Sequence, residues 1–151
     1  MNERPYEPAD LPSVIETYTA SIRVLAAPYY TSEQIAAWAP IPPDAGRWQA
    51  SLPTRTSPRK LRFLHARRYL DILFTHPAFA RHGVASSLYR CVESALRAVN
   101  TPKVTTLASL AARPFFDRYG FQLDSEECVE CRGAYLRRFV MHKQLRNERI
   151  A

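Results

Sequence analysis

The fold of this chain is decided by the stretch Tyr69-Leu-Asp-Ile-Leu-Phe-Thr-His-Pro-Ala-Phe-Ala-Arg-His-Gly-Val-Ala-Ser-Ser-Leu88. Residues 69–75 are mostly β-branched, aromatic or leucine, and Pro77 follows, so a strand is predicted to end before the proline. From Val84 to Val99 apolar residues recur every three or four positions, which predicts an amphipathic helix over 83–99 packed on a sheet. Strand alternation places Leu70, Ile72 and Phe74 on one face and Tyr69, Asp71, Leu73 and Thr75 on the other.

A short basic loop, Arg81-His-Gly83, connects the expected strand to the expected helix. The start of a helix presents unpaired backbone N–H groups and the positive end of the helix dipole to an anion. Gly83 allows a positive φ or a close approach of the backbone to a ligand, and Arg81 adds charge that can pair with phosphate oxygens. The loop is therefore either a phosphate-binding site or an ordinary β–α connection.

Two segments resemble motifs of the GNAT superfamily of N-acyltransferases. Residues 80–85 match the pyrophosphate-loop pattern Gln/Arg-x-x-Gly-x-Gly/Ala, except that Ala80 stands at the first position. Residues 108–121 resemble the segment Asn-x-x-Ala-x-x-x-Tyr-x-x-x-Gly-Phe, and the overall likeness extends from Tyr69 to Leu145. The resemblance implies a mixed α/β (α+β) domain with a GNAT-like central mixed sheet flanked by helices.

The resemblance also implies acetyl-CoA as the acyl donor, held in a gap beside the 69–75 strand. Backbone at 73–75 would contact the thioester, with the N–H of Phe74 facing the oxyanion, and the loop and helix start would hold the pyrophosphate. The residues implied to contact acetyl-CoA are Leu73, Phe74, Thr75, Arg81, His82, Gly83, Val84, Ala85, Ser86, Ser109, Ala112 and Phe116.

Catalytic roles are implied for Asp71 and Tyr119. Asp71 is a candidate base that deprotonates the amine directly or through water, or else a structural carboxylate bonded to backbone or arginine. His76 is either a second candidate base or a turn residue. Phe116 stands where the family often has a tyrosine acid, so Tyr119 is the substitute, although a CoA thiol with a pKa around 8.5 can leave without an acid.

The first forty residues are predicted to form two helices. Asp10 is a candidate N-cap for a helix from Leu11 to about Val24, and Thr31 with Gln34 has capping-box spacing for a second helix over 32–39. Residues 1–8 are expected to supply an edge strand. Tyr30 and Trp38 either belong to the core or, as one bacterial GNAT branch of unassigned substrate implies, line the acceptor pocket.

The middle of the chain departs from the family pattern. Residues 40–58 are rich in proline and are predicted to be mostly loop, and Leu61 to Ala66 is a candidate strand. The space before Tyr69 is short for two strands, so either the sheet is trimmed there or one strand is heavily altered. A poorly covered sheet edge near Leu61 suggests a homodimer.

The last third is predicted to form a parallel strand, a helix and an antiparallel pair. The strand covers 103–109, the helix 110–119 with Gly120 after its end, and the pair 121–129 and 134–141 around Gly133. A single domain over 1–151, with an exposed C-terminal tail, is expected from the chain length.

The net charge of +7 suits either a ligand with several phosphates or a nucleic acid. No nucleic-acid-binding motif accompanies the arginines, so nucleic acid is an unlikely partner. There is no apolar run long enough to cross a membrane and no signal core, which predicts a cytoplasmic protein. Cys128-Val-Glu-Cys131 is a lone C-x-x-C, which falls short of a zinc site, so no metal is expected.

These patterns predict an N-acetyltransferase that moves an acetyl group from acetyl-CoA to a primary amine of a small molecule or peptide. The alternative is a non-catalytic GNAT-fold protein that binds CoA as a sensor or interaction module. The Arg81–Ala85 loop and Asp71 favour the enzyme, whereas Ala80, Phe116 and the short middle segment favour the alternative.

Overall fold

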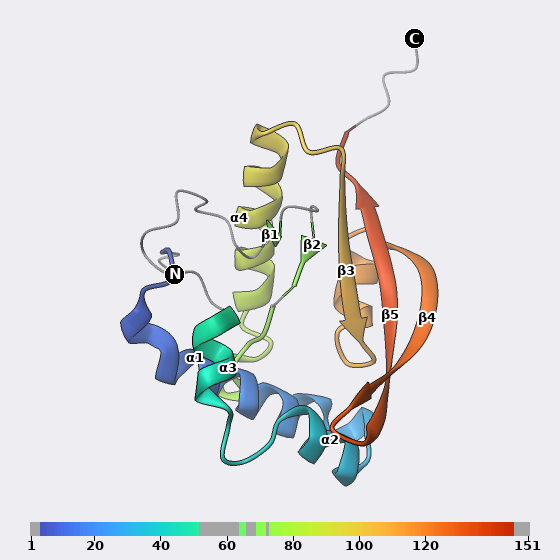
Figure 1. Ribbon diagram of the computed structural model, residues 1–151. Helices are drawn as coiled ribbons and strands as arrows, with labels where there is room; N and C mark the ends of the chain where they lie inside the picture. Colours follow the sequence, from blue (N-terminus) through green and yellow to red (C-terminus); the bar gives the residue numbers. More distant parts are fainter. Residues whose placement is uncertain (1–3, 52–63, 66–68, 72, 147–151) are drawn as a thin grey trace.

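The structure is a computed structural model that describes residues 4–51, 64–65, 69–71 and 73–146. A mixed sheet has helices packed against it and further helices crossing at one end of its strands (Figure 1). The helices, in chain order, are η1 (Pro8–Asp10), α1 (Leu11–Ala20), η2 (Ser21–Ala26), η3 (Ala27–Tyr29), α2 (Ser32–Trp38), α3 (Ala45–Ser51), η4 (Pro77–Phe79), α4 (Val84–Ala98) and α5 (Arg113–Arg118). The strands are β1 (Leu64–His65), β2 (Tyr69–Leu70), β3 (Lys103–Ser109), β4 (Gln122–Cys131) and β5 (Ala134–Gln144).

The described strands are ordered β1-β2-β3-β5-β4. β2 and β3 are parallel, and the other neighbouring pairs are antiparallel. β3 and β5 pair along the whole of β3, and the alternating burial of β3 shows that one of its faces packs against helices. The predicted mixed α/β fold with a central mixed sheet is thus confirmed.

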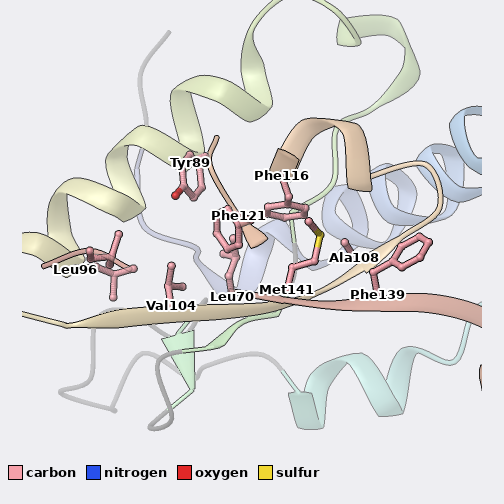
Figure 2. Close-up of a cluster of buried hydrophobic side chains, with 10 residues drawn as sticks. Leu70, Tyr89, Leu96, Val104, Ala108, Phe116, Phe121, Phe139 and Met141 are labelled. Atoms are coloured by element: carbon pink, nitrogen blue, oxygen red, sulfur yellow. The ribbon is translucent and has the colours of Figure 1, made fainter. Parts of the chain in front are cut away.

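One face of the sheet packs against α4 and α5 through the larger hydrophobic cluster (Figure 2). Tyr89 and Leu96 of α4 and Phe116 of α5 meet side chains from β2, β3 and β5, among them Leu70 and Met141. Cys91 and Val99, which the predicted stripe of α4 includes, are exposed, and Tyr89 is buried in their place. The apolar face of α4 thus keeps Val92 and Leu96 of the predicted stripe and also includes Tyr89, while Cys91 faces solvent.

A second hydrophobic cluster lies where η2 and α2 meet the end of the sheet. Its buried members are Ile22, Ala26, Ile35 and Ala39, and Tyr18, Tyr30, Trp38, Phe74 and Ala111 pack against them. In Figure 1, α1 and α2 cross below the ends of the strands, at the end toward which β3 points. Two clusters thus meet at one end of the parallel strands.

β2 and β3 separate soon after they pair. The ladder joins Tyr69 to Thr105 and Leu70 to Thr106, and the Thr106 hydroxyl donates to the Leu70 carbonyl at 2.9 Å. The predicted strand over 69–75 is therefore too long, since strand geometry ends at Leu70. Leu70 and Leu73 both pack on the larger cluster, whereas Phe74 packs on the second. The predicted alternation is wrong beyond Leu70 because the backbone there has left the ladder; Ile72 lies outside the described residues.

Several predicted elements are confirmed with small shifts of boundary. The capping box of Thr31 and Gln34 is formed at the start of α2. β3 has the predicted bounds, and Gly120 follows α5 with φ 80°. The turn between β4 and β5 has positive φ at Arg132 and Gly133, the geometry of a tight hairpin. α5 begins at Arg113 rather than 110, because the Ser109 hydroxyl accepts from Ala112 N–H and holds a turn first.

Other predictions near the N-terminus differ from the structure. Residues 4–8 form no strand. Asp10 is the N-cap residue of α1, as predicted, but its carboxylate makes no bond to the helix; it accepts from Arg4 at 2.8 Å and from Glu7 N–H at 2.8 Å. α1 ends at Ala20, and the chain continues as the π-helix η2. The Asp10 carboxylate, which was predicted to cap α1, thus forms its hydrogen bonds around the 3-10 turn η1 instead.

The segment predicted as loop contains the helix α3. Within the predicted strand over 61–66, residues 64–65 form β1; the rest of it, the trimmed middle strands and the proposed dimer edge at Leu61 lie outside the described residues. Across the part of the chain that the structure describes, no helix is long and apolar enough to cross a membrane.

Candidate functional site

A small cavity lies where β2 and β3 part. Its volume is about 160 Å³. Seven of the residues that the sequence assigns to the cofactor line it: Leu73, Phe74, Thr75, Ala85, Ser109, Ala112 and Phe116. Its other walls come from η2, α2 and the β3–α5 region, with Ser21, Ile22, Leu25, Ala26, Trp38, Ala111 and Phe115. We call this space the donor cavity. Residues from separate sequence motifs line it together, and most of them are apolar.

The loop before α4 presents an anion-binding geometry next to this cavity. Gly83 is the N-cap of α4 with φ 80°, and no side chain caps the helix there. Arg81 has φ 64°, and both Arg81 and His82 are exposed. Because Ala85 in the first turn of α4 lines the donor cavity, the free N–H groups and the cavity are continuous. A Cβ at Gly83 would meet nothing within 4 Å, so the backbone conformation rather than space favours glycine.

A larger cavity of about 560 Å³ opens on the other side of Phe74. Phe74, Trp38 and Ser109 line both cavities, so the two meet at these side chains. The acceptor cavity, as we call this larger space, takes its walls from α1, α2, α3, β2, β3 and the β4–β5 hairpin. Asp71, Tyr30 and Trp38, which the sequence assigns to catalysis and the acceptor, all line it.

Aromatic rings form a continuous wall on the acceptor side. Tyr18 contacts Trp48 and Phe74 edge to face, with ring centroids 4.6 Å and 4.7 Å apart. Trp38 lies 6.4 Å from Phe74 and 5.4 Å from Tyr30. Edge-to-face contacts of this kind hold each ring in a fixed orientation. The wall therefore offers a preformed apolar surface that ends at Phe74, where the two cavities meet.

Tyr30 connects three parts of the site through its hydroxyl. The hydroxyl donates to the carbonyl of Arg137 at 2.8 Å and accepts from Leu110 N–H at 2.9 Å. Burial raises the pKa of this phenol, so it remains protonated at neutral pH. The ring of Tyr30 packs on the second cluster and also lines the larger cavity, so its position suits both predicted alternatives; a role in binding the acceptor stays a prediction.

Asp71 lies at the end of β2, exposed at the acceptor cavity and close to Tyr69. Burial, followed by the negative charge of Asp71, raises the pKa of Tyr69 to about 12. The Tyr69 phenol is therefore a hydrogen-bond donor at neutral pH beside a carboxylate. This pair is suited to hold and deprotonate an amine.

Two other candidates lie away from the cavities. Tyr119 packs against Tyr89 and Phe115, with centroids 4.7 Å and 4.8 Å apart, and is not among the described residues that line either cavity. His76 accepts from Ala78 N–H through Nδ1 at 3.1 Å, so it is a turn residue, one of its two predicted roles. Cys131 is a free thiol at the acceptor cavity, and the described residues contain no group of three or more side chains suited to a metal ion.

The residues of the acceptor cavity that sequence reasoning missed include Tyr18, Arg47, Trp48, Tyr69 and Arg132. Tyr18 lies in the predicted helix from Leu11 to about Val24, and Tyr69 lies on one face of the predicted strand over 69–75, but neither was predicted to act at the site. Arg47 and Trp48 were assigned to a loop, although residues 47–51 contain no helix breaker and Asp44 precedes them as a capping side chain. That capping residue was the available signal for α3.

Comparison with known proteins agrees with this arrangement. The profile of the Acetyltransferase (GNAT) domain matches residues 61–145. The chain belongs to the GNAT acetyltransferase family. It is 33% identical over 145 residues to the uncharacterized N-acetyltransferase YafP of Escherichia coli K12, covering 91% of this chain and 92% of that protein. This enzyme is thus a GNAT-type N-acetyltransferase, as predicted.

Solved structures show the same fold. A GCN5-related N-acetyltransferase from Rhodopseudomonas palustris superposes with a TM-score of 0.81 at 26% identity, with 93% of each chain covered. The PaiA N-acetyltransferase from Thermoplasma acidophilum, solved in complex with coenzyme A, gives a TM-score of 0.66 at 15% identity, covering 93% of this chain and 96% of that one. The second likeness concerns the fold alone.

Proposed function

We propose that this GNAT enzyme transfers an acetyl group from acetyl-CoA to a primary amine of a small molecule or peptide. The observation that supports this most directly is the parting of β2 and β3 after Leu70 and Thr106. The gap holds a cavity that begins at the first turn of α4 and meets a second, larger cavity at Phe74. One space suits an acyl donor and the other an amine, and they share a boundary where the two can react.

On the donor side, Arg81 and the N–H groups of residues 83–86 bind the pyrophosphate, because the helix start supplies both unpaired donors and positive potential. The apolar walls of the donor cavity, with Ala85, Ala112 and Phe116, hold the pantetheine arm. Backbone at 73–75 has left its ladder partner, so its N–H and C=O groups are available to orient the thioester.

On the acceptor side, Asp71 takes a proton from the ammonium group, directly or through a water, and the Tyr69 hydroxyl orients the amine. The neutral amine attacks the thioester carbon; an N–C bond forms and the C–S bond breaks. The N–H of Phe74 stabilises the oxyanion during this step. The sulfur leaves as thiolate, since a thiol pKa near 8.5 makes an acid dispensable, and the thiolate or a water takes the second proton that the nitrogen loses as the amide forms. Proton donation by Tyr119 stays a prediction.

Calorimetric titration of acetyl-CoA tests the donor site, with Gly83→Asp as the variant and Gly133→Asp as its control. Both glycines have φ near 80° and nothing within 4 Å of an added Cβ, so the two changes carry similar backbone strain. Of the two variants, only Gly83→Asp places a carboxylate at the proposed phosphate site. We expect its dissociation constant to rise at least about a hundredfold, because a phosphate contact is replaced by charge repulsion.

Equal binding by wild type and Gly83→Asp would contradict the assignment of the loop, and no binding by folded wild type would contradict the proposal as a whole. Thiol release from acetyl-CoA with a panel of primary amines then tests transfer. Binding without release by any amine would favour the alternative of a CoA-binding sensor.

A further inference from the structure

The charged side chains around the acceptor cavity are unevenly paired. Two of its four arginines are neutralised on the hairpin: Arg137 Nε lies 2.6 Å from Glu126 Oε1, and Arg138 is paired with Glu127. The other two, Arg47 of α3 and Arg132 of the hairpin turn, have no carboxylate within 4 Å in the described parts of the chain. The cavity therefore has two guanidinium groups whose charge is not balanced locally.

Arg47 and Arg132 line the same cavity, although they come from elements far apart in sequence. Their charges also act on Tyr18, which lines that cavity: burial raises the pKa of Tyr18, while a hydrogen bond with Trp38 and the two positive charges oppose that rise. Arg132 is held in position because its Nη1 donates to the Ala37 carbonyl at 2.8 Å. One such bond leaves the other N–H donors of a guanidinium free for a ligand.

The acidic side chains do not neutralise this pair. Asp44 Oδ1 accepts from the backbone N–H of Arg47 at 3.0 Å, so that carboxylate caps α3. Glu130 also lines the cavity, but in the described residues it forms no ion pair within 4 Å with either arginine. Asp71, the remaining carboxylate, lines the cavity beside Tyr69 and forms no ion pair with either arginine there.

The aromatic wall connects the place where β2 and β3 part with α3. Tyr18 contacts Phe74 at one edge, where the thioester is proposed to lie, and Trp48, the neighbour of Arg47, at another. A volume of about 560 Å³ is in the range of small-molecule sites. A cavity with an aromatic wall, a carboxylate beside Tyr69 and two guanidinium groups without an ion-pair partner in the described residues matches a molecule with an apolar body and the reverse charges.

We propose that the acceptor is a zwitterion, in which an apolar body lies along the aromatic wall, the amine is next to Asp71, and a carboxylate is bound by Arg47 and Arg132. Guanidinium groups bind carboxylates through paired, charge-assisted hydrogen bonds, so they select for an acid over its ester. This inference rests on the proposed acetyl transfer for its reaction, but the carboxylate site can be tested by binding alone.

The probes are 4-(aminomethyl)benzoate, its methyl ester and benzylamine, titrated calorimetrically into the enzyme in the presence of CoA. The variants are Arg47→Met and Arg132→Met, with Arg90→Met as the control, since Arg90 is an exposed arginine of α4 that lines neither cavity. In the described residues the Arg47 side chain makes no hydrogen bond or ion pair, so Arg47→Met still tests the inference if the loss of the Arg132 bond to Ala37 affects the hairpin.

We expect wild type and Arg90→Met to bind the acid at least about tenfold more tightly than the ester, and Arg47→Met to lose most of this preference. Equal binding of acid and ester, or an unchanged preference in Arg47→Met, would overturn the inference. Acetyl transfer measured with the same probes separates the two proposals. Equal transfer to acid and ester leaves the proposed function standing and contradicts the zwitterion; selective binding of the acid without transfer to any amine contradicts the proposed function instead.

Discussion

The donor and acceptor cavities share Phe74, Trp38 and Ser109 but are built differently. The donor side consists mainly of small or apolar residues and of backbone groups freed where a strand and a helix begin or end. The acceptor side consists of large aromatic and charged side chains from six elements. The comparison indicates that binding of a common donor depends on backbone geometry, whereas choice of the acceptor depends on side chains that can change without altering the sheet.

The largest effect is expected from Asp71→Asn, which changes the acceptor side of the site and leaves the donor side unchanged. Loss of the base is expected to lower kcat/KM roughly a hundredfold or more, with acetyl-CoA affinity unchanged. Steady-state rates and calorimetry measure the two quantities. Asp44→Asn is the control, because asparagine keeps the acceptor oxygen that caps α3 at the same cavity. A wild-type rate in Asp71→Asn would remove Asp71 from the mechanism.

A smaller effect, on the donor side, is expected from Ala112→Leu. The added carbons enter a cavity of about 160 Å³, so acetyl-CoA affinity is expected to fall at least about tenfold. Binding of the amine probes without CoA is expected to stay unchanged. Ala98→Leu, at the exposed end of α4, is the control. If both ligands lost affinity equally, the two cavities would not be separable sites.

Trp48→Ala tests the aromatic wall. Its ring contacts Tyr18 edge to face at 4.6 Å, and its loss is expected to raise the acceptor KM by about tenfold while kcat and acetyl-CoA affinity stay close to wild type. Trp48→Phe is expected to recover most of the loss, because a smaller ring keeps the contact. A change in kcat without a change in KM would show that Trp48 acts on the reaction rather than on acceptor binding.

The smallest effect on either cavity is expected from Glu93→Gln, which changes stability instead. Burial alone would raise the pKa of Glu93, but hydrogen bonds from Lys143 at 2.8 Å and Arg97 at 2.6 Å lower it from 4.5 to about 2. A lowered pKa contributes stability that is present above pH 4.5 and is lost as pH falls toward 2. We expect Glu93→Gln to lose about 2 kcal/mol at pH 7.

Chemical denaturation at several pH values measures this effect. Wild type is expected to lose stability between pH 4.5 and pH 2 more steeply than Glu93→Gln. Glu126→Gln, which removes an exposed ion pair with Arg137, is the control and should change stability less. Parallel pH curves for wild type and Glu93→Gln would contradict the role given to this carboxylate.

The sequence predicted the donor side well because its information is local. A glycine at a helix start, the small residue Ala85 and the strand over 103–109 occupy positions fixed by backbone geometry, and these positions recur as motifs. The hairpin was predicted for the same reason, since Gly133 is at the turn and both strands alternate. Each of these features depends on residues only a few positions apart.

The acceptor side was predicted poorly because it depends on tertiary contacts. The proline-rich composition of 40–58 concealed α3, so Arg47 and Trp48 had no predicted element. Simple alternation failed at Leu73 and Phe74, because that rule requires a ladder partner, and the ladder ends at Leu70. Arg132 was seen only as part of a turn, since nothing in the sequence places it beside Arg47.

The separation of β2 from β3 also has a consequence for the order of folding. Their contact joins residues 36 positions apart, as in the bond from Thr106 to Leu70, whereas β4 and β5 pair around a tight turn. Pairing β2 with β3 closes the longer loop, which costs more chain entropy. The short ladder between them recovers little of that cost. We expect pulse-labelled amide exchange to show protection of the hairpin before protection of Leu70 and Thr106. The nascent enzyme would then complete its β4–β5 hairpin before it assembles the gap in which acetyl transfer is proposed to take place.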